Sequence, residues 1–197
     1  MRLVNKTAAI ALALGLAGCG SLLGGGKPPA NLVTLTPEAS EPASMARTAA
    51  AGQSVTVEAP AVSRELSNVR VPVQVSPTDV QYVAKLTLAD TPAKLFQGLL
   101  AETIRRTTNR VVLGPTQTTL DPGLNVSGQL ERFGYDAASG QVIVSYDGAL
   151  STAGGARVET RRFTATAPAD GTASSVGPAL NRAANQVALD VAKWVGG

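Results

Sequence analysis

The chain has 197 residues, of which 16% are charged, and its formal net charge at neutral pH is +3. It contains one Cys and no His, which excludes an intramolecular disulfide, a Ser-His-Asp triad and a catalytic Cys-His pair. Only 4% of the residues are aromatic, so the composition lacks the interleaved basic and aromatic residues typical of a nucleic-acid-binding face.

The N-terminal segment has the pattern of an export signal. Arg2 and Lys6 supply positive charge ahead of the apolar run Thr7–Leu16. A membrane-spanning helix needs about 20 apolar residues, so this run is too short to span a bilayer. It has the length of a signal-peptide core, and we predict that residues 1–18 are removed. Their removal leaves 15 basic and 14 acidic residues, a nearly neutral mature chain.

The predicted signal ends in Leu16-Ala17-Gly18-Cys19. This tetrad resembles the lipobox of bacterial prolipoproteins, whose first three residues are recognised by the lipoprotein signal peptidase. The resemblance implies that the Cys19 sulfur receives a diacylglycerol, that cleavage precedes Cys19, and that the freed amine is acylated with a chain such as palmitate. A free buried Cys is the alternative interpretation. Two or three acyl chains anchor a protein firmly, whereas one binds a membrane only marginally.

The residue after Cys19 and the segment that follows bear on location and organisation. Gram-negative lipoproteins with Asp after the Cys stay in the inner membrane; here the residue is Gly20, which implies the periplasmic face of the outer membrane. Residues 19–31 include Gly24-Gly25-Gly26 and Pro28-Pro29, a composition typical of a tether. We predict that residues 32–197 form one periplasmic domain.

The first part of this domain is predicted to consist of short strands and a loop. Alternation of apolar and polar residues and β-branched composition favour strands, and Ala, Ser, Thr and Glu favour a mobile loop. The predicted strands are Leu32–Leu35, Ser54–Glu58, Val71–Val75 and Val80–Ala84, and the predicted loop is Pro37–Gly52. Pro72 lacks a backbone donor, so it suits an edge strand or the start of a strand.

A helix is predicted from Asp90-Thr91-Pro92 to Asn109. A capping side chain followed by Pro at the first helical position is a typical helix start. Apolar residues then recur at spacings of three and four, which places them on one buried face. They are Leu95, Phe96, Leu99, Leu100 and Ile104. Val111–Leu113 is predicted to begin the next strand.

The C-terminal part is predicted to be a three-stranded meander and a second helix. The strands are Leu124–Phe133, Gln141–Leu150 and Val158–Ala165, with short Gly-containing connections that indicate hairpins. The helix begins near Ser175–Pro178, presents Leu180, Ala184, Val187, Val191 and Trp194 on one face, and ends at Gly196-Gly197. Both helices need an apolar surface to cover. We therefore predict an α+β fold with an antiparallel or mixed sheet of about four to five strands and two helices on one face.

Several of these segments together resemble the ABC-type transport auxiliary lipoproteins, which accompany MCE-type lipid-transport systems. The resemblance lies in the order of the lipobox, Leu32–Pro37, Val55-Thr56-Val57, Asp79–Tyr82, Thr91–Phe96 and Ala101–Ile104. The family often has Trp shortly before the helix start and Tyr in the first strand, where this chain has Leu88 and Leu32.

The resemblance implies a noncatalytic accessory lipoprotein anchored in the outer membrane. Its implied partners are a periplasmic MCE protein and, through it, an ABC permease and ATPase that move lipids or other apolar substrates across the periplasm. It implies no cofactor apart from the covalent lipid on Cys19, and leaves open a homo-oligomer such as a symmetric ring. The alternative function is an outer-membrane assembly or structural lipoprotein that partners a β-barrel, since fold alone does not decide function.

An enzyme is a second alternative. A metal site would need carboxylates alone, and the spacing of a pair such as Asp121 and Glu131 is no better than chance. A two-carboxylate glycosidase remains formally open. We expect neither.

Binding residues within the domain are less well specified. Tyr82, Phe96 and Trp194 are candidates to line a lipid groove, although aromatics at such spacings are more often core residues. The loop Pro37–Gly52 and the tip Ala153–Ala156 are the predicted partner contacts, because loops often carry recognition. Arg105-Arg106 and Arg161-Arg162 are expected to be solvated rather than to bind phosphate.

Overall fold

The computed structural model describes residues 31–44, 46–117, 121, 123–152 and 157–196. The chain divides into two units, residues 1–30 and residues 31–197. The second unit contains the sheet and the helices. The predicted signal, the lipobox and the tether up to residue 30 lie outside the described residues.

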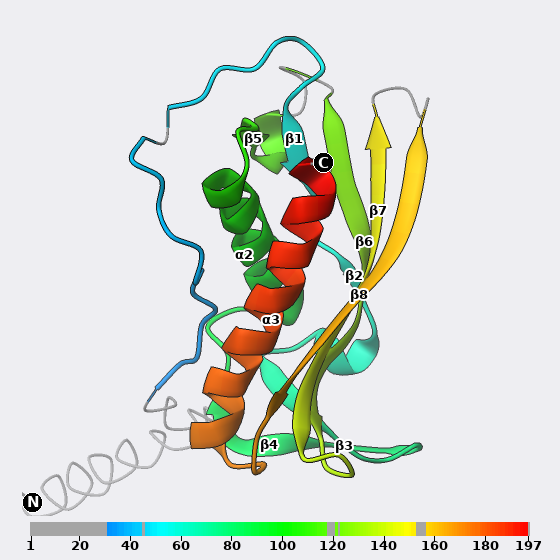
Figure 1. The fold of residues 1–197 in the computed structure, drawn as a ribbon. Coiled ribbons are helices and arrows are strands. Elements are labelled where there is room, and N and C mark those ends of the chain that lie inside the picture. Colours follow the sequence, from blue (N-terminus) through cyan, green and yellow to red (C-terminus); the bar gives the residue numbers. More distant parts are fainter. Residues whose placement is uncertain (1–30, 45, 118–120, 122, 153–156, 197) are drawn as a thin grey trace, which may run out of the picture. The chain divides into compact units, whose positions relative to one another are not determined.

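The long strand β6 (Leu124–Asp136) organises the sheet. One side of β6 pairs antiparallel with β7 (Gln141–Thr152) along its whole length, and β7 pairs antiparallel with β8 (Val158–Pro168). These pairings confirm the predicted meander. Figure 1 shows the three strands running together along one side of the domain.

The other side of β6 pairs in turn with three strands from the first half of the domain. They are β1 (Val55–Val57), β2 (Ala61–Val62) and β3 (Arg70–Ser76), all parallel to β6. β3 also forms an antiparallel hairpin with β4 (Asp79–Thr87), and β1 pairs in parallel with β5 (Val112–Leu113).

The described sheet therefore has eight strands and is mixed. The α+β class is confirmed, but the prediction of four to five strands was too small, because β6 recruits short strands from the first half of the chain. Two 3-10 turns, Arg64–Leu66 and Pro115–Gln117, connect these strands.

Pro72 occupies an inner strand rather than an edge, since β3 lies between β4 and β6. Its missing N–H is tolerated because pairing with β6 begins only at Val73. The predicted strand Leu32–Leu35 is not formed; Val33 makes a single parallel bridge with Leu88.

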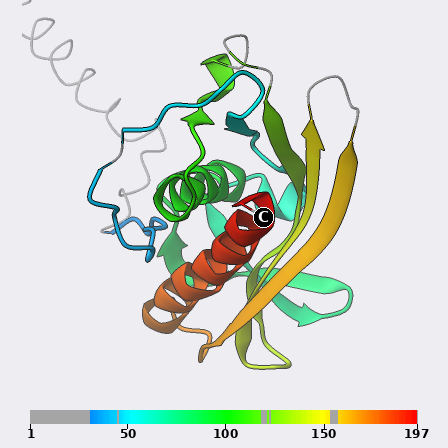
Figure 2. The same ribbon diagram turned by 45° about the horizontal axis from the view of Figure 1, so that its top comes forward.

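Helices α2 (Pro92–Thr107) and α3 (Ala173–Gly196) lie side by side on one face of the sheet, as predicted (Figure 2). Pro92 is the first residue of α2, but Thr91 makes no side-chain cap hydrogen bond. Instead, the carboxylate of Asp90 accepts the backbone N–H of Thr91 at 2.7 Å. α3 begins slightly earlier than predicted.

The core lies between the two helices and the sheet. Phe96 of α2 and Tyr146 of β7 are fully buried and pack with ring centroids 5.2 Å apart. Phe163 of β8 packs against Trp194 of α3 at 5.5 Å. These contacts tie both helices to the meander. None of the described helices has the length and apolar character needed to cross a membrane.

Candidate functional site

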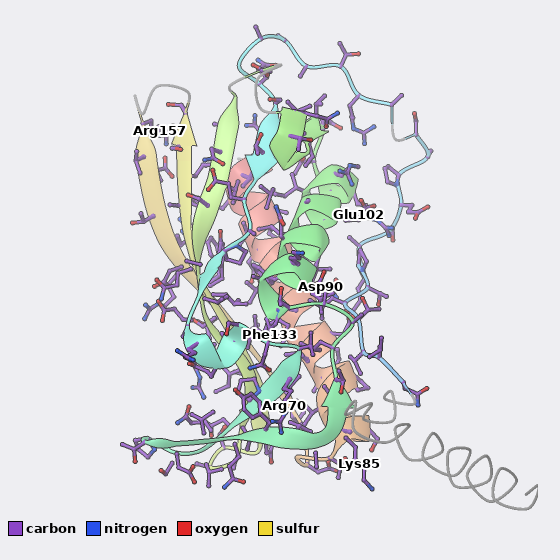
Figure 3. The ribbon with its side chains drawn as sticks, turned by 180° about the vertical axis from the view of Figure 1, so that it is seen from behind. Arg70, Lys85, Asp90, Glu102, Phe133 and Arg157 are labelled. Atoms are coloured by element: carbon purple, nitrogen blue, oxygen red, sulfur yellow. The ribbon has the colours of Figure 1, made fainter. Side chains whose placement is uncertain are left out.

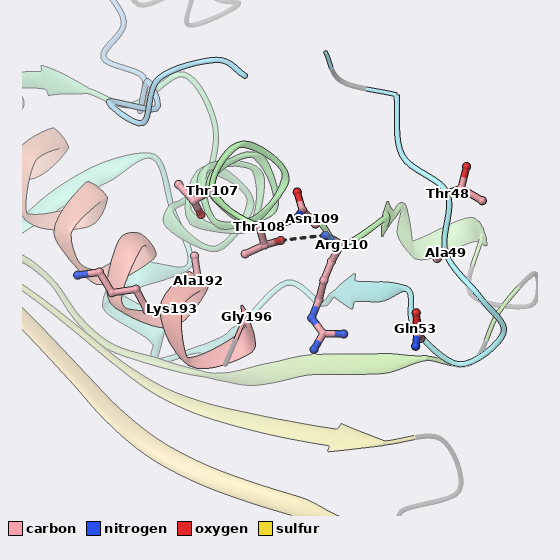
Figure 4. A pocket seen from close by; sticks show the side chains of 10 residues that line it. All are labelled: Thr48, Ala49, Gln53, Thr107, Thr108, Asn109, Arg110, Ala192, Lys193 and Gly196. Atoms are coloured by element: carbon pink, nitrogen blue, oxygen red, sulfur yellow. Dashed lines mark hydrogen bonds between the residues drawn. The ribbon is translucent and has the colours of Figure 1, made fainter. Parts of the chain in front are cut away.

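One hollow of the described domain lies where α2 and α3 end. It has a volume of about 660 Å³, and its walls come from the ends of both helices and from the segment before β1 (Figure 4). The lining residues are Thr48, Ala49, Gln53, Thr107, Thr108, Asn109, Arg110, Ala192, Lys193 and Gly196.

A second hollow of about 350 Å³ shares Arg110 and Lys193 with the first. It extends the lining over apolar residues of β6, β7 and α3, namely Leu124, Leu150 and Trp194. We call the two hollows together the helix-end groove. The groove thus combines an apolar wall with cationic side chains.

Arg110 is the residue that joins the two parts of the groove. Its Nε donates to the carbonyl oxygen of Val195 at 3.0 Å, and its backbone N–H donates to Thr108 Oγ1 at 3.2 Å. The first bond satisfies a carbonyl in the last turn of α3, where the helix dipole favours a positive charge. The guanidinium is therefore held at the junction by the folded helix end.

The other charged groups of the groove form pairs. Lys193 Nζ lies 3.2 Å from Asp190, and Arg157 forms an ion pair with Glu159. The Trp194 indole N–H donates to Glu159 at 3.2 Å. Glu159 thus links the apolar wall to the cationic rim.

The chemistry of these groups suits binding. Arg110 and Lys193 can attract a carboxylate or phosphate, while Leu124, Leu150 and Trp194 offer apolar contact. The carboxylate among the described lining residues, Glu159, is already engaged by Arg157 and Trp194. An acidic, partly apolar segment of another protein would match this surface.

The three aromatic candidates are not brought together. Phe96 is fully buried in the core. Tyr82 is half-buried on β4, where Arg70 stacks over its ring at 4.2 Å and Asn68 bonds its hydroxyl. Trp194 alone of these three lines the helix-end groove. A single lipid groove lined by all three is therefore wrong.

The predicted mobile loop Pro37–Gly52 is partly fixed. Its first residues are hydrogen-bonded to α2 and α3, and Thr48 and Ala49 line the helix-end groove. Arg106, expected to be solvated, is only 16% exposed at its side chain and pairs with Glu102 and Glu41. Arg162 is largely exposed, as expected, and pairs with Asp147.

Asp121 accepts the backbone N–H groups of Ser54 and Gly52, and these bonds lower its pKa below the ordinary value. Among the described residues no group of three or more His, Cys, Asp or Glu is arranged to hold a metal ion. Cys19, the preceding Leu16, Ala17 and Gly18, and the tip Ala153–Ala156 lie outside the described residues.

Arg110 was not identified from the sequence. Its signal is weak, because a single Arg just after a helix end is common and its partner Val195 is distant in the chain. The groove forms only when α2, α3 and the loop before β1 meet.

Comparison with known proteins finds one family model and similar folds over nearly the whole described domain. The family model described as ABC-type transport auxiliary lipoprotein component matches residues 34–192. A crystal structure of a Xanthomonas campestris protein of the family DUF330 superposes with a TM-score of 0.65 at 18% identity, covering 83% of this chain and 91% of that one. The crystal structure of an uncharacterized protein gives a TM-score of 0.60 at 15% identity, covering 76% and 96%. No curated protein matches the sequence significantly.

Proposed function

Because the chain belongs to the ABC-type transport auxiliary lipoprotein component family, we propose that it is a noncatalytic subunit of an MCE-type system that moves lipids or other apolar substrates across the periplasm. The observation that carries this proposal is the family match over nearly the whole domain, residues 34–192. ATP hydrolysis would take place in a cytoplasmic partner. This chain would supply a fixed point at the outer membrane.

The anchor in this proposal is the acylated Cys19. It follows Leu16-Ala17-Gly18 and precedes Gly20, the sequence arrangement that supports lipidation and outer-membrane sorting. Two or three acyl chains provide the stable attachment that one chain does not. No other cofactor is proposed.

The described domain has two distinct ends, which supports a role between a membrane and a partner. The described chain starts at Asn31, beside the β4 end marked by Lys85, whereas the helix-end groove lies at the opposite end near Arg157 (Figures 1 and 3). A domain attached through Asn31 can present the groove away from the attachment point. We assign the groove as the contact for the periplasmic MCE protein.

Charge supports this assignment. Arg110 and Lys193 lie beside apolar Trp194 and Leu150, so an acidic segment with apolar residues would be complementary. Several copies of the chain around one partner would form a symmetric ring, the form in which we expect a homo-oligomer.

Co-purification tests the proposal. The full-length lipidated protein is solubilised in mild detergent, and its bound proteins are identified. We expect the MCE protein, the permease and the ATPase. Recovery of a β-barrel without an MCE protein would instead support an assembly lipoprotein and overturn the proposal.

Variants test the groove separately. Lys193→Glu combined with Arg110→Gln should reduce recovery of the MCE protein, because positive charge is lost while Gln keeps a donor for Val195. Arg64→Glu, an exposed charge reversal on the 3-10 turn after β2, should leave recovery unchanged. Equal recovery with all variants would show that the groove is not the contact, even where the partners are correct.

A further inference from the structure

The first residues of the described chain cross the outer side of α3 and are held by two asparagines. Thr36 N–H donates to Asn181 Oδ1 at 2.9 Å, and Glu38 N–H donates to Asn185 Oδ1 at 2.8 Å. Asn185 Nδ2 donates to the carbonyl oxygen of Thr36 at 2.9 Å, and Asn181 Nδ2 to the Glu38 carboxylate at 3.0 Å. We call residues 32–41 the strap.

The spacing of the two asparagines matches the strap. Residues four apart on a helix are separated by about 6.0 Å along its axis, and residues two apart in an extended chain by about 6.6 Å. Asn181 and Asn185 therefore meet alternate peptide units at Thr36 and Glu38. The intervening Pro37 has no N–H, and none is needed there.

Asn185 has little other role. It is 7% exposed, and its side chain bonds the strap and the carbonyl oxygen of Asn181 one turn earlier. A buried amide costs stability unless its donors and acceptor are paired. The strap supplies most of that pairing.

Arg106 of α2 fastens the end of the strap. It donates to the carbonyl oxygen of Ala39 at 3.0 Å and to the Glu41 carboxylate at 2.9 Å, while Glu102 holds its Nε at 2.8 Å. At the other end, Val33 shares two backbone hydrogen bonds with the chain at Thr87 and Ala89.

Beyond Glu41 the described chain makes no hydrogen bond to the helices or the sheet until Gly52. The hydrogen bonds of the described residues from Pro42 to Ala51 are local, formed within this segment or with Gln53. The next attachment to the rest of the domain is Gly52 N–H on Asp121 at 2.6 Å. Once the strap is released, the next hydrogen bond that joins the described chain to the rest of the domain is therefore at Gly52.

We infer that the strap can detach from α2 and α3, and that its attachment sets how far the domain can stand from its lipid anchor. With the strap bound, the roughly 12 residues from Cys19 to Asn31 reach at most about 40 Å; with it released, the roughly 33 residues from Cys19 to Gly52 reach about 110 Å. The inference rests on the proposed lipidation of Cys19. We call Asn181 and Asn185, the two asparagines that hold the strap, the clamp.

The strap has the features of a segment that opens locally. Leu35 is its only buried residue; the others are half-buried or exposed. Its bonds are mainly side chain to backbone rather than a continuous ladder, and each contributes modestly once the recovered chain entropy is counted. Segments with few buried apolar contacts open more readily than the core.

Hydrogen exchange on the full lipidated chain tests the clamp. In Asn181→Ala/Asn185→Ala, exchange at Thr36 and Glu38 should be roughly tenfold faster, as expected when an ordinary hydrogen bond is lost, with α3 unchanged. Gln186→Ala is the matched control, because Gln186 bonds Asp190 on the same helix instead. Glu38→Pro removes a strap donor without altering the helix and should free the rest of the strap likewise.

The distance between the domain and the membrane is measured on vesicles of phosphatidylethanolamine with a minority of phosphatidylglycerol. A donor dye is attached through Thr78→Cys, an exposed residue of the β3–β4 turn, and acceptor dyes lie in the bilayer. Because the Cys19 sulfur is acylated, the introduced thiol is the only reactive one. Energy transfer should fall in the clamp variants and stay unchanged in Gln186→Ala.

Two results would overturn the inference. One is that neither hydrogen exchange nor energy transfer changes in the clamp variants. The other is that energy transfer in the wild type is already as low as in those variants. A protein that does not bind vesicles and carries an unmodified Cys19 would refute the proposed anchoring instead. In that case hydrogen exchange still decides whether the clamp holds the strap.

Discussion

Replacing Tyr146 with Phe isolates one buried hydrogen bond at the centre of the domain. Tyr146 is 1% exposed, and its hydroxyl donates to the carbonyl oxygen of Ser127 on β6 at 2.6 Å. Phe keeps the ring against Phe96, so apolar burial changes little. The Ser127 carbonyl loses its donor, which should cost about 1 to 2 kcal/mol of the free energy of unfolding at neutral pH.

The same substitution has a pH signature. Burial of the hydroxyl, assisted by the charge of Glu58, raises the pKa of Tyr146. Below the ordinary tyrosine pKa of about 10 both folded and unfolded forms are neutral, so the contribution of Tyr146 is complete. Above it the unfolded chain ionises first, and the wild type should lose about 1.4 kcal/mol more than Tyr146→Phe between pH 9 and pH 11.

Urea unfolding at several pH values measures both effects, with an unchanged m-value as the sign that the folded domain is intact. The difference between wild type and Tyr146→Phe should shrink as the pH rises above 10. A difference that is absent at neutral pH, or that stays constant up to pH 11, would refute the role assigned to this buried hydroxyl.

Four further substitutions test the core, two glycine positions and one ion pair. Phe96→Ala removes a fully buried ring and should lower the free energy of unfolding by about 3 to 5 kcal/mol; a loss below about 1 kcal/mol would show that the core is misassigned. Gly128→Ala places a Cβ 2.1 Å from a β7 carbonyl oxygen at φ +153° and should lower the free energy of unfolding by at least about 2 kcal/mol. Gly98→Ala lies in open space on α2 and should raise the free energy of unfolding by about 0.5 to 1 kcal/mol. Thermal unfolding of the two variants tests this, and equal effects would contradict the prediction. Hydrogen bonding by Arg132 lowers the pKa of Asp136 to about 2, so the Asp136 carboxylate stabilises the fold above pH 4 and this contribution is lost as the pH falls toward 2. The stability of Asp136→Asn should therefore approach that of the wild type in acid unfolding. A stability difference that persists at pH 2 would contradict this.

Local patterns predicted the helices and the meander well. Phe96, Leu99 and Ile104 recur at helical spacing and are buried on one face of α2. The alternation along β6, β7 and β8 is continuous enough to define strands. β1, β2 and β5, by contrast, have three, two and two residues, too few for a periodic signal. Their partners lie far away in the sequence, so only the folded chain defines the full sheet.

The candidate sites also differ in how far the sequence alone predicts them. The lipobox is a contiguous motif, and the sequence alone therefore suffices to propose Cys19 as the lipidated residue. The helix-end groove requires Arg110, Trp194 and Thr48 to meet from three segments, which no local pattern indicates. Arg106 was expected to be solvated, but it pairs with Glu41 on the strap. The path of the strap across the helices has no sequence signature, so this pairing could not be predicted.

Mass spectrometry of the mature N-terminal peptide, taken from protein extracted from membranes, tests the central proposal most directly. We expect a mature chain that begins at Cys19 and carries two or three acyl chains. A peptide that retains residues 1–18 with an unmodified Cys19 thiol would contradict the anchor, the location and the partnership proposed for this domain.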